Sequence, residues 1–204
     1  MKIKICGITN LEDALASIEY GADALGFVFY PNSPRYVIPE KVAEIMAQLP
    51  PFITTVGVFV NEDPAKIKEI MASARLRVLQ LHGDETPQTC SIWKPVVKAF
   101  RVKDFVDLKP LELYKGIAAY LIDSYAPSSY GGTGQIFNWD IAVEAKKFGN
   151  IILSGGLTPE NIEKAVSWVK PYAVDVSSGV EAAKGKKDLK KVRKFIERAK
   201  KAAV

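Results

Sequence analysis

Hydrophobic positions along the chain fall into two alternating patterns. Short runs rich in β-branched and aromatic residues, typical of strands, are each followed by a longer stretch with apolar residues at helical spacing. The strand-like runs cover residues 2–6, 24–29, 53–60, 77–82, 96–100, 118–123, 150–155 and 172–177. The helical stretches cover residues 10–20, 39–49, 64–74, 86–92, 103–115, 139–148, 159–168 and 188–202.

This alternation of eight strands with eight helices favours a parallel sheet. An open doubly wound sheet usually has about five or six strands, and its nucleotide-binding form carries a G-x-G-x-x-G fingerprint after the first strand. The sequence has no such fingerprint there. We therefore predict the α/β class and a single (β/α)8 TIM barrel, with one domain over residues 1–204. Active sites of this fold lie at the C-terminal ends of the strands.

Alternation within the strands assigns several polar residues to the barrel interior. In KIKIC, Ile3 and Ile5 suit the side that faces the helices, which turns Lys4 and Cys6 inward. The same reasoning in the other strands turns inward Gln80, His82, Asp123, Asp175 and Ser177. Barrel interiors are usually filled by Val, Ile and Leu, and buried charge is costly unless it is paired or functional. These residues are therefore candidates for function.

Cys6 ends the first strand. A lone cysteine is commonly a small buried apolar residue, and Cys90, in a helical stretch, is given that interpretation. Cys6 differs because it lies at a strand mouth with Lys4 two residues earlier, and a nearby cation favours the thiolate and lowers the thiol pKa. Lys4 and Asp175 belong to the first and eighth strands, which are neighbours in a closed barrel. We expect an interior ion pair between them.

Three other side chains each have a structural and a functional interpretation. His82, the single histidine, either caps a strand end or lines the substrate site. Asp123 is followed by a long loop, with the next helix expected about 15 residues later, so helix capping does not explain it. Arg35, in YPNSPRY, is either an exposed loop arginine or a bidentate partner for a planar carboxylate.

Glycine-rich turns follow the last three predicted strands. LSGGLTPENI and DVSSGVE follow the seventh and eighth strands, and in this fold those two loops frequently build a phosphate site from backbone N–H groups. Together they predict a phosphorylated substrate, held by Gly155, Gly156, Ser177, Ser178 and Gly179. The loop SYAPSSYGGTGQIFN is predicted to be a lid over the substrate, with its glycines at Gly131, Gly132 and Gly134.

Charge and cysteine content limit the partners and the compartment. The net charge of +5 arises largely from KGKKDLKKVRKFIERAKKAAV, where apolar residues at helical spacing favour a docked helix with a solvated lysine-rich face over a nucleic-acid site. Two distant cysteines form neither a disulfide framework nor a zinc site, which favours free thiols in the cytoplasm. The sequence shows no signal peptide and no apolar run of bilayer length, so we expect no membrane partner.

The motifs together resemble a known family. The segments KICGIT, GADALGFVFYPNSPRY, VGVFVN, LQLHGDE, LIDS with YGGTGQIFNW, LSGGLTPENI and AVDVSSGVE are similar, in this order and over nearly the whole chain, to phosphoribosylanthranilate isomerase of tryptophan biosynthesis. The resemblance implies an enzyme without metal or organic cofactor. The implied reaction is an Amadori rearrangement of N-(5-phosphoribosyl)anthranilate, an aminoaldose, to the 1-deoxyribulose (aminoketose) phosphate.

The resemblance also implies roles for the candidate residues. Cys6 is the expected general base and Asp123 the general acid, while Arg35 binds the anthranilate carboxylate. His82 and Asp175 are expected to line the substrate, and the turns after the seventh and eighth strands to hold its phosphate. The expected partner is a small phosphorylated molecule, and the enzyme is expected to be a monomer or a homodimer.

Other functions stay open from the residues alone. A sugar-phosphate isomerase would use paired carboxylates and give Cys6 no role, and an indole-glycerol-phosphate synthase would need a catalytic lysine at a strand mouth. A non-catalytic barrel would bind a phosphorylated metabolite as a sensor. A nucleic-acid binder would use the basic C-terminal segment.

Overall fold

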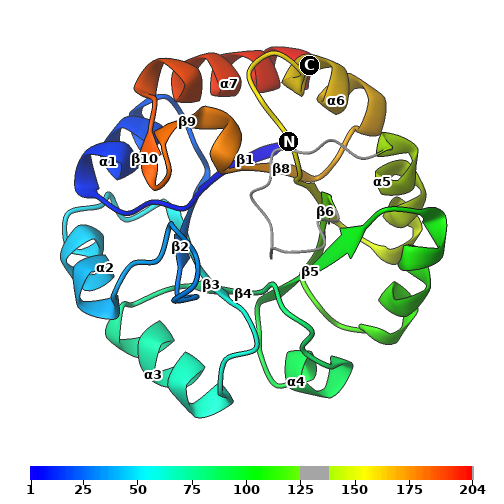
Figure 1. The fold of residues 1–204 in the computed structure, drawn as a ribbon, viewed down its shortest axis with the longest axis horizontal. Helices are drawn as coiled ribbons and strands as arrows, with labels where there is room; N and C mark the ends of the chain where they lie inside the picture. Colours follow the sequence, from blue (N-terminus) through cyan, green and yellow to red (C-terminus); the bar gives the residue numbers. More distant parts are fainter. Residues whose placement is uncertain (125–137, 204) are drawn as a thin grey trace.

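The barrel is closed by parallel pairing alone. In the computed structural model, which describes residues 1–124 and 138–203, eight strands follow one another around the ring and β8 pairs back to β1 (Figure 1). The strands are β1 (Lys2–Cys6), β2 (Ala24–Val28), β3 (Thr54–Phe59), β4 (Val78–Leu81), β5 (Val96–Val102), β6 (Ala119–Ser124), β7 (Ile151–Leu153) and β8 (Ala173–Val176). The predicted TIM barrel is confirmed.

Helices form a ring outside the strands (Figure 1). They are α1 (Leu11–Glu19), α2 (Pro39–Met46), α3 (Pro64–Ser73), α4 (Pro87–Ser91), α5 (Trp139–Ala145), α6 (Ile162–Val169), α7 (Leu189–Ala202), and the 3-10 segments η1 (Phe105–Leu113) and η2 (Lys146–Phe148). Local sequence starts several of them. The Asn10 side chain accepts from Asp13 N and the Asp63 side chain from Lys66 N, which satisfies amides that have no partner within the helix.

Two segments differ from the sequence prediction. The fifth helix is a 3-10 helix, because Pro110 inside it lacks an N–H and disfavours a continuous α-helix. A two-stranded hairpin of β9 (Glu181–Ala183) and β10 (Lys186–Lys187) follows η3 (Ser178–Val180), in a stretch for which no strand was expected. The Lys187 side chain, expected on a solvated face, is buried.

The interior and exterior of the barrel follow the predicted alternation. Ile3 and Ile5 pack in the large core between strands and helices, where burial of each contributes roughly 1.5–3 kcal/mol. A separate small cluster fills the inside of the barrel and consists of Val97, Ala99, Ala119, Leu121, Ile152 and Ala173. Toward the C-terminal ends of the strands the interior holds buried polar side chains beside a small apolar cluster of Cys6, Val28 and Val58, and that change locates the site.

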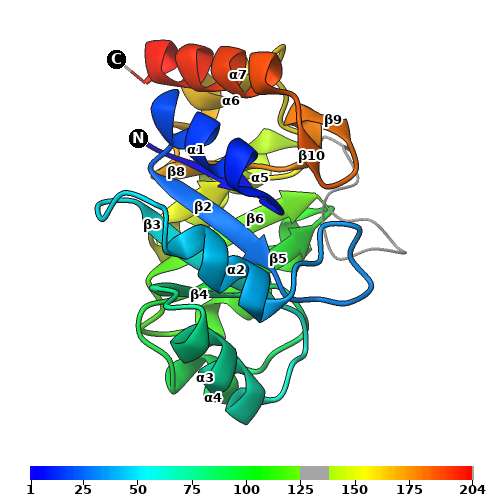
Figure 2. The same ribbon diagram turned by 90° about the vertical axis from the view of Figure 1, so that its left-hand side faces the viewer.

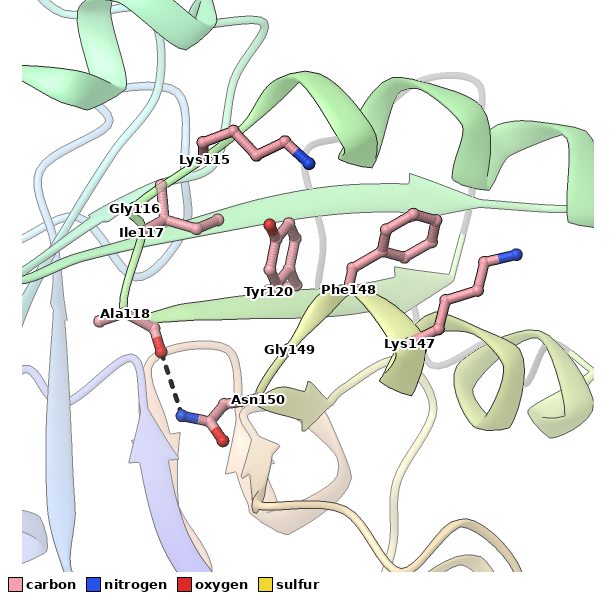
Figure 3. Close-up of a pocket in the computed structure, with 9 residues that line it drawn as sticks. All are labelled: Lys115, Gly116, Ile117, Ala118, Tyr120, Lys147, Phe148, Gly149 and Asn150. Carbon is pink, nitrogen blue, oxygen red and sulfur yellow. Dashed lines mark hydrogen bonds between the residues drawn. The ribbon is translucent and has the colours of Figure 1, made fainter.

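Two cavities lie away from the C-terminal mouth. One, of about 400 Å³, opens at the N-terminal end of the barrel and reaches inward to Lys4 and Gln80. The other, of about 360 Å³, lies outside the strands between the loops at 115–118 and 147–150, against the Tyr120 ring, and Asn150 donates to Ala118 O beside it (Figure 3). No helix among the described residues has the length and apolar character needed to cross a membrane.

Candidate active site

The C-terminal ends of the strands bring the predicted polar residues into one buried interior. Figure 2 shows the strands running from the end where both chain termini lie to the end where β9 and β10 lie. At this second end Cys6 closes β1, His82 follows β4, Asp123 is in β6 and Asp175 is in β8, and all four are buried. The structure thus places these candidates together, as the alternation predicted.

Lys4 and Asp175 form the expected interior ion pair. Their residues are register partners across β1 and β8, and Lys4 Nζ lies 3.0 Å from Asp175 Oδ1, with both side chains about 6% exposed. Burial is the largest effect and disfavours the charged lysine, but Asp175 and Cys6 together outweigh it and raise the Lys4 pKa. Each buried charge is therefore stabilised by the other.

Gly26 in β2 makes room for this group. A Cβ at position 26 would lie 2.7 Å from Cys6 Sγ and 3.0 Å from Lys4 Cε, too close for any side chain to fit without displacing them. The Cys6 thiol and the Lys4 side chain therefore both pack directly over the β2 backbone, and their proximity results from a residue that lacks a side chain.

The environment of Cys6 differs from the expectation of a lowered thiol pKa. Burial is the largest effect and raises the Cys6 pKa, and nearby Asp175 raises it further. Lys4 and Lys187 act in the opposite direction without overcoming burial. The thiol is therefore protonated near neutral pH in the ligand-free protein, and only a small fraction is thiolate.

Asp123 is oriented by its own backbone and faces His82. Its Oδ1 accepts from Ser124 N at 2.8 Å, while Oδ2 lies 3.3 Å from His82 Nε2. The other ring nitrogen, Nδ1, is 3.0 Å from Gln80 Nε2. If the Gln80 amide donates to Nδ1, the imidazole carries its proton on Nε2, toward the carboxylate. His82 is therefore in contact with Asp123 rather than capping a strand end.

The loops after β7 and β8 touch one another. A Cβ at Gly179 would lie 1.9 Å from Leu157 O, so the two turns approach as closely as a glycine allows. Gly155 and Gly156 have positive φ angles of 81° and 64°, and a Cβ at Gly155 would lie 2.9 Å from Asp123 Oδ1. The Ser177 hydroxyl is buried and has no hydrogen-bond partner among the described residues. The predicted phosphate turns are thus adjacent to each other and to Asp123.

Arg35 is neither exposed nor free. Its Nε and Nη2 both donate to the Glu181 carboxylate at 2.8 Å, and Lys187 Nζ lies 3.2 Å from the same carboxylate. Sequence reasoning overlooked Glu181 and Lys187 because both belong to the β9–β10 hairpin. Gly185, between two short runs in EAAKGKK, was the available signal for a turn.

The proposed lid glycines, Gly131, Gly132 and Gly134, lie outside the described residues, so their role stays a prediction. Within residues 1–124 and 138–203 the His, Cys, Asp and Glu side chains form no group of three or more suited to a metal ion.

Comparison with known proteins agrees with this arrangement. The family model of N-(5'-phosphoribosyl)anthranilate isomerase matches residues 3–198. The chain belongs to this family. It is 59% identical over 201 residues to the N-(5'-phosphoribosyl)anthranilate isomerase of Geobacter sulfurreducens, with 98% of each chain covered.

Solved structures of phosphoribosylanthranilate isomerases share the fold over the full length. The crystal structure of the Thermotoga maritima enzyme superposes with a TM-score of 0.92 at 45% identity, covering 98% of this chain and 99% of that one. A second structure, with a TM-score of 0.89, 43% identity and the same coverage, holds reduced 1-(o-carboxyphenylamino)-1-deoxyribulose 5-phosphate. The chain is therefore a phosphoribosylanthranilate isomerase family enzyme of tryptophan biosynthesis, which confirms the resemblance found in its sequence.

Proposed function

We propose that the chain, as a single domain over residues 1–204, catalyses the Amadori rearrangement of N-(5-phosphoribosyl)anthranilate with Cys6 as general base and Asp123 as general acid. The observation that carries this proposal is the placement of both groups at the barrel mouth, buried and each beside a partner of its own. Lys4 and Gly26 define the position of Cys6, and His82 and Ser124 that of Asp123.

The first step opens the sugar ring. Asp123 donates its proton to the furanose ring oxygen as the C1–O bond breaks, and the nitrogen lone pair forms the C=N bond of a Schiff base. His82 Nε2 lies 3.3 Å from Asp123 Oδ2, so the imidazole helps to hold the carboxyl group in place for this step.

The second step removes the proton from C2 of the sugar. The Cys6 thiolate accepts this proton, the electron pair moves to form the enolamine, and tautomerisation gives the ketone. Because burial raises the Cys6 pKa, the thiolate forms in a small fraction of molecules. The positive charges of Lys4 and Lys187 stabilise that thiolate and so limit the rise in the pKa. No redox change occurs, so the step needs no oxidant or reductant.

The phosphate and the anthranilate carboxylate, at the two ends of the substrate, have their own proposed binding groups. The turns formed by Gly155, Gly156 and residues 177–179 offer backbone N–H groups and the unpartnered Ser177 hydroxyl to the phosphate. Arg35 offers a guanidinium to the anthranilate carboxylate, and Asp175 lines the sugar. A related enzyme binds a reduced product carrying the same phosphate and carboxyphenyl groups, which supports this assignment. We expect cytoplasmic action without a metal or cofactor, and neither a membrane nor a nucleic-acid partner.

Alkylation should inactivate the enzyme through Cys6. Iodoacetamide is expected to abolish turnover of phosphoribosylanthranilate, measured by the loss of its fluorescence, and a product analogue should protect. Because only the thiolate reacts and burial raises the thiol pKa, the inactivation rate should still rise with pH above about 8.5. A rate that levels off below about pH 8 would show a lowered thiol pKa instead.

The matched control for alkylation is Cys90→Ala. Cys90 is 1% exposed, and burial raises its pKa to about 11, so it should not react. The variant is expected to turn over substrate like the wild type and to be inactivated at the same rate. If Cys90→Ala is no longer inactivated, the alkylated thiol is Cys90 and the proposal is contradicted.

Of the two assembly states expected from the sequence, we propose the homodimer. A solved structure that is 42% identical to this chain shows monomers generated from the dimeric phosphoribosylanthranilate isomerase of T. maritima. In this chain the loop between α2 and β3 projects at the N-terminal end of the barrel (Figure 2), and it carries Phe52, which is 99% exposed. Tyr172 is half-exposed at the same end, beside the cavity of about 400 Å³. Covering this apolar surface favours pairing through this end, away from the active site.

Phe52→Glu should convert the dimer to a monomer, because a carboxylate at the interface would be buried without a partner. Light scattering coupled to size-exclusion chromatography measures the mass. Phe105→Glu, which alters a half-exposed phenylalanine on η1, is the control and should remain dimeric. A wild-type protein that is monomeric at every concentration tested would rule out the proposed dimer.

A further inference from the structure

The Arg35 guanidinium uses only part of its hydrogen-bonding capacity in the structure. Its side-on pair, Nε and Nη2, donates two hydrogen bonds of 2.8 Å to the Glu181 carboxylate. A guanidinium has five N–H groups, and the three others make no hydrogen bond to residues 1–124 or 138–203. The end-on pair of Nη1 and Nη2 therefore remains able to take a second carboxylate in bidentate form.

The Arg35 side chain is also confined along its stem. Gly7, with φ of 74°, follows Cys6, and a Cβ at Gly7 would lie 2.7 Å from Arg35 Cδ. The aliphatic part of Arg35 thus crosses directly over the turn that leaves β1. The aliphatic part of Arg35 contacts Gly7 and its guanidinium binds Glu181, and these two contacts together determine the direction of the guanidinium.

Glu181 belongs to a hairpin that contacts two neighbouring segments. The β9–β10 hairpin lies beside α1 (Figure 1), where Lys187 N donates to Asp13 Oδ2 at 2.8 Å. A Cβ at Gly185 in the hairpin turn would lie 3.0 Å from Pro34 O, so the turn touches the loop that carries Arg35. The hairpin that carries the Glu181 carboxylate is therefore held against both α1 and the Arg35 loop.

Lys187 is the second cation in contact with the Glu181 carboxylate. Its side chain is 0% exposed, and its Nζ lies 3.2 Å from Glu181 Oε1 and 3.3 Å from Ser177 O. Burial lowers the Lys187 pKa, and Glu181 is the carboxylate that opposes this effect. Burial would raise the Glu181 pKa, but Arg35 and Lys187 outweigh it and hold that pKa below its usual value. Glu181 is thus an ionised carboxylate shared by two cations.

We infer that Glu181 is a positioning residue for recognition of the substrate's carboxylate. It fixes the side-on pair of Arg35 and so directs the end-on pair to the carboxylate of the anthranilate ring. Glu181 touches no reacting atom and acts through Arg35. The inference rests on the proposed role of Arg35 and adds that the direction of its guanidinium, and not only its charge, determines the preference for a carboxylate-bearing substrate.

The test compares two substrates with and without the carboxylate. Glu181→Gln is expected to raise KM for phosphoribosylanthranilate by about tenfold or more, the equivalent of one lost charged hydrogen bond, with little change in kcat. With N-(5-phosphoribosyl)aniline, which lacks the carboxylate, KM should change by less than about threefold. Glu197→Gln, which removes an exposed partner of Arg193 at 2.8 Å, is the matched control and should behave as wild type with both substrates.

Two double variants separate positioning from folding. Arg35→Ala with Glu181→Gln should bind phosphoribosylanthranilate no worse than Arg35→Ala alone. Glu181→Gln with Lys187→Met removes the lysine left unpaired, and should recover thermal stability without recovering KM for phosphoribosylanthranilate.

Three results would overturn the inference: an equal loss with both substrates, no loss with either, or a KM restored together with stability. Its failure is distinguishable from that of the proposed function. If Arg35→Ala loses the preference for the carboxylate and Glu181→Gln keeps it, only the positioning role is wrong. If Arg35→Ala itself keeps the preference for the carboxylate-bearing substrate, the assignment of Arg35 is wrong as well.

Discussion

Cys6→Ala and Asp123→Asn are each expected to lower kcat by about 10²- to 10⁴-fold, the range for loss of a general base or acid. The substrate affinity should change little, because the groups proposed to bind its phosphate and carboxylate are left in place. Turnover is measured by the loss of phosphoribosylanthranilate fluorescence under saturating substrate, with active-site titration by the product analogue as a check on folding.

The substitutions are chosen to disturb the fold little. The amide introduced by Asp123→Asn retains an oxygen that can accept from Ser124 N, as the Asp123 carboxylate does at 2.8 Å in the structure. Cys6→Ala removes one sulfur from above Gly26 and leaves the Lys4–Asp175 pair intact. Loss of kcat is then attributable to loss of the proton-transfer group.

The two variants should also differ in pH dependence. Wild-type activity should gain from rising pH as the Cys6 thiol ionises, because burial raises its pKa. Cys6→Ala removes that titrating thiol, so its residual activity should lack the alkaline rise, while Asp123→Asn should keep it. Near-wild-type turnover in either variant, or an alkaline rise that persists in Cys6→Ala, would contradict the acid–base assignment.

The barrel could be predicted from the sequence because its signals are local and repeated. KIKIC gave the bounds of β1, and its alternation correctly turned Lys4 and Cys6 inward, since a residue's side of a strand depends on parity alone. The Lys4–Asp175 pair followed from one further step, the adjacency of the first and last strands in a closed sheet. The seven other strands were placed correctly, with bounds shifted by one or two residues at most ends.

The features that escaped prediction depend on tertiary contacts. Glu181 and Lys187 lie in a two-stranded hairpin too short to show a period, and charged residues there are ordinarily exposed. The Cys6 pKa was misjudged because a sequence shows a neighbouring cation, Lys4, but not the depth of burial that outweighs it. Gly26 gave no sign of its role, because a close approach between β1 side chains and the β2 backbone exists only in the folded barrel.

The second large effect concerns stability, and Lys4 is its test. Lys4→Met should destabilise the protein by roughly 3–5 kcal/mol, because Asp175 would remain buried without its cation. For a domain of about this size that corresponds to a fall in Tm of roughly 6–20 °C, measured by calorimetry or circular dichroism. The double variant Lys4→Met/Asp175→Leu removes both charges and should recover most of the loss.

A control for Lys4→Met lies in the same strand. Lys2 pairs with Asp23 at 2.8 Å, but its side chain is 62% exposed, so Lys2→Met should change the free energy of unfolding far less than Lys4→Met. Both substitutions replace a lysine by methionine in β1. Lys2 and Lys4 differ chiefly in burial. If they destabilise equally, water reaches the barrel interior and the Lys4–Asp175 pair is not a buried one. If the double variant recovers nothing, the loss arises from packing of the lysine stem over Gly26 rather than from the unpaired charge.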